Sequence, residues 1–170
     1  MRDPRDVFVS IYFYKARRSR SLNESISAFL RNERPGGLDS ILTWMNRWAE
    51  NLSVPKDLLL VRYEQMRENT VREVRRIINF MSLEGIDDET IERAVEFARF
   101  DRMRRMEAQD AMNSHRLRAK AASDSESYTV RKGKVGGYRD YLSRDDIAFI
   151  EAKIADQLSD YYAYYKYTSS

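Results

Sequence analysis

The chain has 170 residues, of which 42% are hydrophobic and 34% are charged, and its formal net charge is +3. This length fits one domain, and no run approaches the roughly 20 apolar residues of a membrane-spanning helix. The absence of cysteine excludes disulfides, thiolate metal sites and a cysteine nucleophile, and the one histidine, His115, leaves little for imidazole catalysis or zinc binding. The charged start from residue 2 does not fit a signal peptide.

The first motif is the segment RDPRDVFVS at residues 2–10. Proline suits the first turn of a helix, where its missing N–H is not needed. A helix N-terminus also offers unpaired N–H groups and the positive end of a dipole to an anion. Arg2 and Ser10, eight positions apart, are therefore candidates for binding a phosphate group.

The remaining pattern predicts a mostly helical chain. Apolar spacing and the breaker at residues 35–37 predict helices over residues 7–18, 26–30 and 38–52, with Trp44 and Trp48 on one face and interpreted as core. Residues 70–73 fit a capping box for a helix that reaches residue 81. Further helices are expected after residue 87 and from about residue 143.

One short segment has a different pattern. Residues 58–61, LLLV, form a continuous apolar run of the kind found in buried parallel strands. A lone buried strand would leave its backbone N–H and C=O groups unpaired, and no other run in this chain is a convincing neighbour. The sequence therefore predicts a strand whose partners it does not contain.

Three motifs together resemble the sulfotransferases that use 3′-phosphoadenosine 5′-phosphosulfate (PAPS) as donor. They are RDPRDVFVS at residues 2–10, RYEQM at 62–66 and RKGKVGGY at 131–138, in the order in which the family has them. The resemblance implies an α/β fold: the C-terminal, mostly helical part of a P-loop-like parallel-sheet sulfotransferase domain. Residues 1–170 would form a single partial domain that lacks the N-terminal loop for the 5′-phosphosulfate.

The resemblance also implies a donor site. Arg2 and Ser10 would bind the 3′-phosphate of the nucleotide from one side, and the segment from Arg131 through Lys132 to Gly133 from the other. Tyr63 matches a tyrosine near the adenine, and Phe100 matches an aromatic residue that packs on it. PAPS would be the co-substrate, and no metal is implied.

Two positions depart from the family pattern at the adenine end, because Ala98 stands where many members have threonine and Arg99 where they have serine. Each candidate also has an ordinary interpretation. Arginine, lysine and serine are common on solvated surfaces, and Tyr63 and Phe100 fit core aromatics equally well. His115 fits a surface histidine.

The implied activity is transfer of a sulfuryl group from PAPS to a hydroxyl or amine acceptor. In the family, a lysine-bearing loop and a catalytic base lie upstream of the motif that begins at Arg2, and neither has a counterpart here. We therefore assign no catalytic residue and expect the isolated chain to be inactive. It is either a fragment of a sulfotransferase or a short protein that binds nucleotide or is completed by a partner.

A different class of function is also open. The 30 basic residues are consistent with a non-catalytic basic helical protein that binds nucleotide or nucleic acid, but 27 acidic residues are interspersed among them. The sulfotransferase interpretation implies PAPS or its product 3′-phosphoadenosine 5′-phosphate (PAP) as the ligand, and no nucleic acid. A cytoplasmic location is expected unless a targeting sequence lies upstream.

Overall fold

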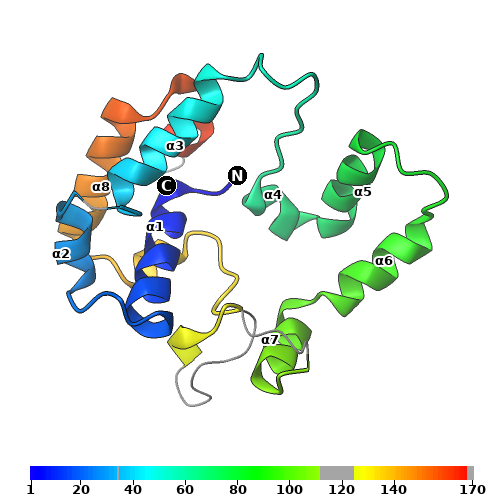
Figure 1. Cartoon of the computed structure of the whole chain (residues 1–170), viewed down its shortest axis with the longest axis horizontal. Coiled ribbons are helices and arrows are strands. Elements are labelled where there is room, and N and C mark those ends of the chain that lie inside the picture. Colours follow the sequence, from blue (N-terminus) through cyan, green and yellow to red (C-terminus); the bar gives the residue numbers. More distant parts are fainter. Residues whose placement is uncertain (34, 112–124, 168–170) are drawn as a thin grey trace. The chain divides into compact units, whose positions relative to one another are not determined.

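The computed structural model describes residues 1–33, 35–111 and 125–167, and every regular element in those ranges is a helix (Figure 1). The interpretation of His115 lies outside the described residues. The chain divides into two compact units. We call Met1 with residues 59–135 the central unit, and residues 2–58 together with the chain from Gly136 on the flanking unit. Among the described helices, none has the length and apolar character needed to cross a membrane.

The flanking unit is built around α1, α3 and α8. Its elements are α1 (Pro4–Phe13), the π-helix η1 (Tyr14–Arg18), α2 (Ile26–Arg31), α3 (Leu38–Glu50), η3 (Gly137–Asp140), α8 (Arg144–Gln157), η4 (Asp160–Tyr162) and α9 (Ala163–Tyr167). α3 packs against both α1 and α8. The core side chains between these helices include Phe8, Leu42, Met45, Ile150 and Ile154.

The start of α1 agrees with the sequence prediction. Pro4 occupies the first turn, and the Asp3 carboxylate caps the helix by accepting the Arg5 N–H at 2.8 Å. The Arg5 side chain is 1% exposed and donates to Asp3 and to the Tyr165 carbonyl. These bonds fix the first turn of α1, and with it the segment that carries Arg2.

The N-terminus of α8 is held by a complete capping box. The Ser143 hydroxyl accepts the Asp146 N–H, and the Asp146 carboxylate accepts the Ser143 N–H. Asp146 is buried and also accepts hydrogen bonds from Ser27 and Arg31 of α2. Burial alone would raise the pKa of Asp146, but these hydrogen bonds outweigh it and lower the pKa to about 2.

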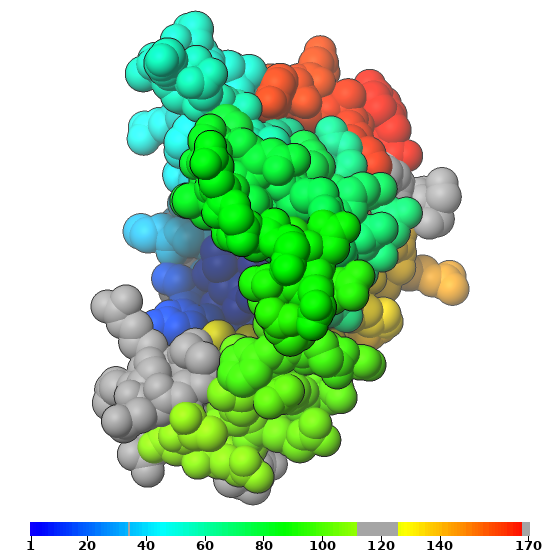
Figure 2. Space-filling model, turned by 90° about the vertical axis from the view of Figure 1, so that its right-hand side faces the viewer, coloured from blue at the N-terminus to red at the C-terminus, as the bar shows by residue number. Residues whose placement is uncertain are grey.

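The central unit consists of short helices with little buried apolar surface. They are α4 (Tyr63–Glu68), α5 (Thr70–Phe80), α6 (Asp88–Phe97), α7 (Phe100–Ala108) and η2 (Ser125–Ser127). Ile91 is the one fully buried apolar side chain among the described residues of this unit. The helices of the central unit, green in Figure 2, are therefore open to solvent over much of their surface.

The predicted capping box at residues 70–73 is wrong in its detail. The cap of α5 is Asn69, whose side chain accepts the Arg72 N–H at 3.0 Å, while the Thr70 hydroxyl donates to the Met66 carbonyl. Glu73 does not reach back to the cap because its buried carboxylate accepts from Arg72 and Arg76. The helix is therefore capped one residue earlier than predicted, and Glu73 forms ion pairs with arginines instead.

The structure assigns no strand to residues 58–61 or to any other described segment, contrary to the prediction at 58–61. A β-strand requires hydrogen bonds to a neighbouring strand, and the described part of this unit provides only one such pair of bonds. The Met1 amino group donates to the Val61 carbonyl at 2.6 Å, and the Tyr63 N–H donates to the Met1 carbonyl at 2.7 Å. This is the bond pattern of one parallel pair, in which Met1 faces Arg62.

Candidate functional site

Arg2, Asp6 and Ser10 follow one another at intervals of four residues at the start of the flanking unit. The Arg2 Nη2 lies 3.3 Å from the Asp6 Oδ2, with 26% of the Arg2 side chain exposed and 1% of that of Asp6. Ser10 lies one turn further along α1 and is exposed. The guanidinium and the hydroxyl predicted to bind phosphate thus both reach solvent, with a buried carboxylate between them.

Phe100 and Gly133 are in direct contact in the central unit. Gly133 has a φ of +58°, and a Cβ placed on it would lie 2.6 Å from Cδ2 and 2.8 Å from Cε2 of Phe100. No real Cβ tolerates such a distance, so only glycine permits both this backbone conformation and this approach of the ring. The structure therefore brings together two of the predicted site residues, which lie 33 positions apart in the sequence.

Residues 131–134, Arg-Lys-Gly-Lys, form what we call the basic loop. The Arg131 side chain is 15% exposed, and its Nη1 lies 3.0 Å from the Glu126 Oε2. The Arg131 carbonyl accepts a hydrogen bond from the Arg104 Nη1 of α7 at 2.6 Å. Lys132 is exposed. The loop thus carries three cationic residues next to Gly133 in the sequence, and α7 contacts it through Arg104 and Phe100.

Two buried carboxylates bind the segments on either side of the basic loop. Glu107 of α7 accepts the Thr129 N–H at 2.7 Å and the Val130 N–H at 2.8 Å, within the central unit. Sequence reasoning missed this residue. The sequence does indicate it by position. Phe100, Met103 and Glu107 follow the spacing of one helix face, so Glu107 lies where an apolar residue is expected.

Asp6 is the second of these carboxylates. It accepts the Gly136 N–H at 3.0 Å and the Tyr138 N–H at 2.9 Å, within the flanking unit. Gly136 has a φ of +68°, the left-handed conformation that glycine adopts most easily. Burial raises the pKa of the Tyr138 hydroxyl, although the Arg5 and Arg139 guanidinium groups oppose the rise. The sequence signal for Asp6 is its place four residues after Arg2 and four before Ser10.

Tyr63 is the first residue of α4 and is half-buried. It belongs to the central unit, as do Phe100 and the basic loop, whereas Arg2 and Ser10 belong to the flanking unit. The structure therefore joins Phe100 to the basic loop inside one unit. In the other unit, Arg2 lies just before α1 and Ser10 lies on that helix.

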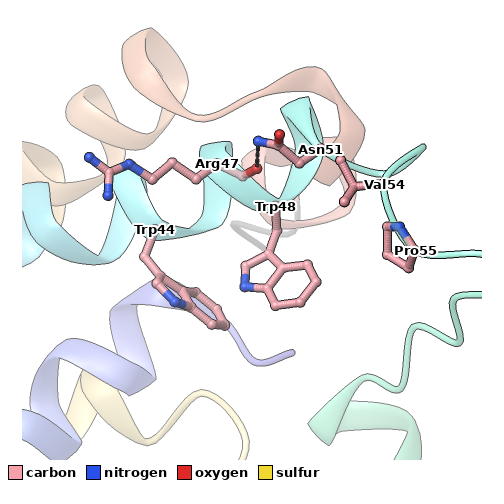
Figure 3. Close-up of a pocket in the computed structure, with 6 residues that line it drawn as sticks. All are labelled: Trp44, Arg47, Trp48, Asn51, Val54 and Pro55. Carbon is pink, nitrogen blue, oxygen red and sulfur yellow. Dashed lines mark hydrogen bonds between the residues drawn. The ribbon is translucent and has the colours of Figure 1, made fainter.

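The interpretation of Trp44 and Trp48 as core residues is wrong. Their side chains are 56% and 42% exposed, because the buried stripe of α3 runs through Leu38, Leu42 and Met45 and leaves both indoles to one side. The two rings meet edge to face at 6.0 Å. Figure 3 shows them on the same side of α3, with Val54 and Pro55 beyond the end of the helix.

These residues line a cavity of about 560 Å³ that contains none of the predicted donor-site residues. Its walls are Trp44, Arg47, Trp48, Asn51, Val54 and Pro55. In Figure 3 the Arg47 side chain points away from the indoles, and the Asn51 amide donates to the Arg47 carbonyl at 2.7 Å. The pocket is therefore mainly an aromatic and aliphatic surface on the flanking unit.

Comparison with known proteins identifies the family. The model of the sulfotransferase domain matches residues 1–162. The chain belongs to the sulfotransferase family. Both the expected family and the mostly helical character of this part of its domain are thereby confirmed.

Several sulfotransferases are similar to nearly the whole chain. Cytosolic sulfotransferase 16 of Arabidopsis thaliana is 29% identical over 171 residues, which cover 94% of this chain and 49% of that protein. Sulfotransferase 2A1 of Macaca fascicularis is 23% identical over 94% of this chain and 55% of its own length. The chain thus spans about half the length of the curated sulfotransferases it matches.

The fold agrees with a solved sulfotransferase. The crystal structure of mouse sulfotransferase SULT7A1 complexed with PAP superposes with a TM-score of 0.75 and 22% sequence identity. The match covers 98% of this chain and 59% of the mouse chain. At this identity the likeness establishes a shared sulfotransferase fold.

Proposed function

We propose that this chain supplies the 3′-phosphate and adenine side of a sulfotransferase donor site. The observation that carries the proposal is the contact between Phe100 and Gly133. It places an aromatic ring against the backbone of a loop that also carries Arg131 and Lys132. An aromatic face beside a basic, glycine-containing loop suits a ligand with a base at one end and a phosphate at the other.

The residues around Gly133 fit a phosphate in charge and in shape. A 3′-phosphate carries up to two negative charges, which a guanidinium binds through two parallel N–H donors. The missing Cβ of Gly133 admits the Phe100 ring, and the backbone N–H of Gly133 is a further donor on the loop. We propose that Arg131, Lys132 and Gly133 bind the 3′-phosphate and that Phe100 and Tyr63 contact the adenine.

Arg2 and Ser10 are proposed to bind the same phosphate from the flanking unit. Support comes from that unit alone: a partly exposed guanidinium lies just before α1, and an exposed hydroxyl lies on that helix. The guanidinium offers paired donors and the hydroxyl a single one. In this proposal both units, together with any further part of the domain, form one nucleotide-binding domain.

The proposed reaction is transfer of a sulfuryl group from PAPS to a hydroxyl or amine. The bond between sulfur and the phosphate oxygen breaks, a bond from sulfur to the acceptor forms, the acceptor loses its proton to a base, and PAP leaves. Residues of this chain bind and orient the nucleotide. We assign none of them to the base or to the 5′-phosphosulfate, and so expect the isolated chain not to transfer sulfate. A cytoplasmic location is proposed because several relatives are named cytosolic.

The proposal is tested with the purified chain and two arginine variants. Arg131→Ala is expected to weaken PAP binding by about tenfold, because a charge-assisted bond to phosphate is lost. Arg93→Ala, in the exposed ion pair with Glu89 of α6, is the control and should leave binding unchanged. Calorimetry with equal affinities for wild type and Arg131→Ala would remove the basic loop from the site. Sulfate transfer from PAPS by the chain alone would contradict its expected inactivity.

A further inference from the structure

The basic loop lies between two segments whose backbone N–H groups are bound by buried carboxylates. Upstream, Glu107 accepts from residues 129 and 130, and downstream, Asp6 accepts from residues 136 and 138. Both carboxylates belong to residues that are 1–2% exposed. Each of these four bonds lies inside a single unit.

Glu107 connects the upstream end of the loop to the helix that carries Phe100. In addition to the two bonds of Glu107, Arg104 from the preceding turn of α7 donates to the Arg131 carbonyl at 2.6 Å. Phe100, at the start of the same helix, packs against Gly133. One face of α7 therefore contacts the loop at successive points from residue 129 to residue 133.

Asp6 connects the downstream end of the loop to the motif that carries Arg2. Its Oδ2 accepts the Gly136 N–H and lies 3.3 Å from the Arg2 Nη2, while its Oδ1 accepts the Tyr138 N–H. A single carboxylate thus sets both the position of a candidate phosphate ligand and the start of η3.

The use of carboxylates at both places has a chemical reason. Two N–H donors from neighbouring residues need an acceptor at each of two oxygens, and an ionised carboxylate provides both. An amide side chain has one oxygen and one NH₂ group, so it would leave one buried N–H facing another donor. The isosteric change from acid to amide therefore disturbs the loop ends while hardly changing side-chain volume.

We propose that Asp6 and Glu107 are positioning residues that hold the two ends of the basic loop, and in the case of Asp6 also Arg2, in the conformation that binds a 3′-phosphate. This inference rests on the proposed function. In this proposal Asp6 and Glu107 do not contact the nucleotide. They fix the position of the groups that bind it, so that binding requires little further rearrangement.

The test compares four acid-to-amide variants of the full chain. Asp6→Asn and Glu107→Gln remove the proposed positioning bonds. Asp146→Asn and Glu73→Gln are matched controls, because each also changes a buried carboxylate, one in each unit, that accepts hydrogen bonds from residues outside 129–138. Calorimetry measures the affinity of each protein for PAP and for 5′-AMP, which lacks the 3′-phosphate.

The expected result is a change in selectivity. The ratio of PAP affinity to 5′-AMP affinity should fall by about tenfold in Asp6→Asn and Glu107→Gln, the loss expected for about one misplaced charge-assisted contact. Both controls should keep the wild-type ratio even if their unfolding temperatures fall. An unchanged ratio in Asp6→Asn and Glu107→Gln overturns the inference and leaves the proposed function standing. A wild-type chain with no preference for PAP overturns both.

A measurement on the wild-type chain covers the case in which a variant does not fold. The N–H groups of residues 129, 130, 136 and 138 should exchange slowly with solvent deuterium before any nucleotide is added. Fast exchange of these four groups in the free chain, followed by protection with PAP, would show that the ligand orders the loop. That outcome would overturn the role of the two carboxylates.

Discussion

The flanking unit and the central unit bury different kinds of side chain. Nearly all fully buried apolar residues among the described parts of the chain lie in the flanking unit, where α1, α3 and α8 meet. In the described part of the central unit the buried set consists of Ile91, Ser127 and two carboxylates, Glu73 and Glu107. The flanking unit is therefore held mainly by hydrophobic packing, and the central unit depends more on hydrogen bonds to buried charges.

This difference matters for the proposed site. The basic loop and Phe100 lie in the unit with the smaller apolar core, so their geometry rests on a few specific contacts. Ser10 lies on α1, whose buried face is part of the larger core, and Arg2 lies two residues before that helix. We expect substitutions in the flanking unit to change global stability, and substitutions around the loop to change local order and ligand binding.

The largest effect is expected from the core of the flanking unit. Phe8 is 0% exposed and stacks on Phe29 with a centroid distance of 5.4 Å. Phe8→Ala should lower the free energy of unfolding by about 3–5 kcal/mol. Ile77→Ala, at a half-buried site of the central unit, should cost less than about 1.5 kcal/mol. Urea unfolding followed by hydrogen exchange measures the free energy of unfolding of both variants. Equal losses would contradict the larger hydrophobic contribution to the flanking unit.

The next effect isolates the contact between Phe100 and Gly133. Gly133→Ala and Gly85→Ala both place alanine at a positive φ in the central unit, but nothing lies within 4 Å of a Cβ at Gly85. Gly133→Ala should therefore cost about 1–3 kcal/mol more than Gly85→Ala, because the added methyl meets the ring. Thermal unfolding of the two variants measures the difference. If they are equally stable, the ring does not pack against this backbone.

A pH-dependent effect of up to about 3 kcal/mol is expected at Asp146. Its pKa of about 2 in the folded chain lies below the value near 3.9 of an unfolded aspartate. The carboxylate therefore stabilises the fold fully above about pH 4, and this contribution is lost as the pH falls toward 2. Asp146→Asn should lower the unfolding temperature at pH 7 and flatten its change below pH 4. Asp156→Asn, at an exposed site of α8, is the control.

The smallest effect is expected at the exposed tryptophans. Trp48→Ala should change the free energy of unfolding by less than about 1 kcal/mol, since 42% of this side chain is already exposed. Met45→Ala, on the buried stripe of the same helix, should cost about 2–5 kcal/mol. Chemical denaturation compares the two variants. A larger loss of unfolding free energy in Trp48→Ala than in Met45→Ala would indicate that Trp48 is a core residue.

Local signals in the sequence predicted the helix starts well. Pro4 in the first turn of a helix, a helix after residue 87 and a helix from about residue 143 were all expected from local signals, and the structure confirms these starts. The cap at Thr70 was wrong because the Glu73 carboxylate pairs with arginines instead. Periodicity could not distinguish the buried face of α3 from the adjoining face that carries Trp44 and Trp48.

In the candidate site, too, the sequence predicted individual residues better than the contacts between them. The motifs identified Phe100 and Gly133 separately, and the structure shows their contact. Asp6 and Glu107 were missed because their partners are backbone N–H groups as far as 132 residues away. Nearly every residue has a backbone N–H, so the sequence does not indicate which one a carboxylate will bind. All seven site residues remain predictions as nucleotide ligands: Arg2, Ser10, Tyr63, Phe100, Arg131, Lys132 and Gly133.

The most direct test of the central claim compares two nucleotides on the unmodified chain. Calorimetry should show that PAP binds at least about tenfold more tightly than 5′-AMP, because only PAP carries the phosphate that the basic side chains are proposed to bind. Equal affinities for the two nucleotides would contradict the assignment of a 3′-phosphate site to this chain.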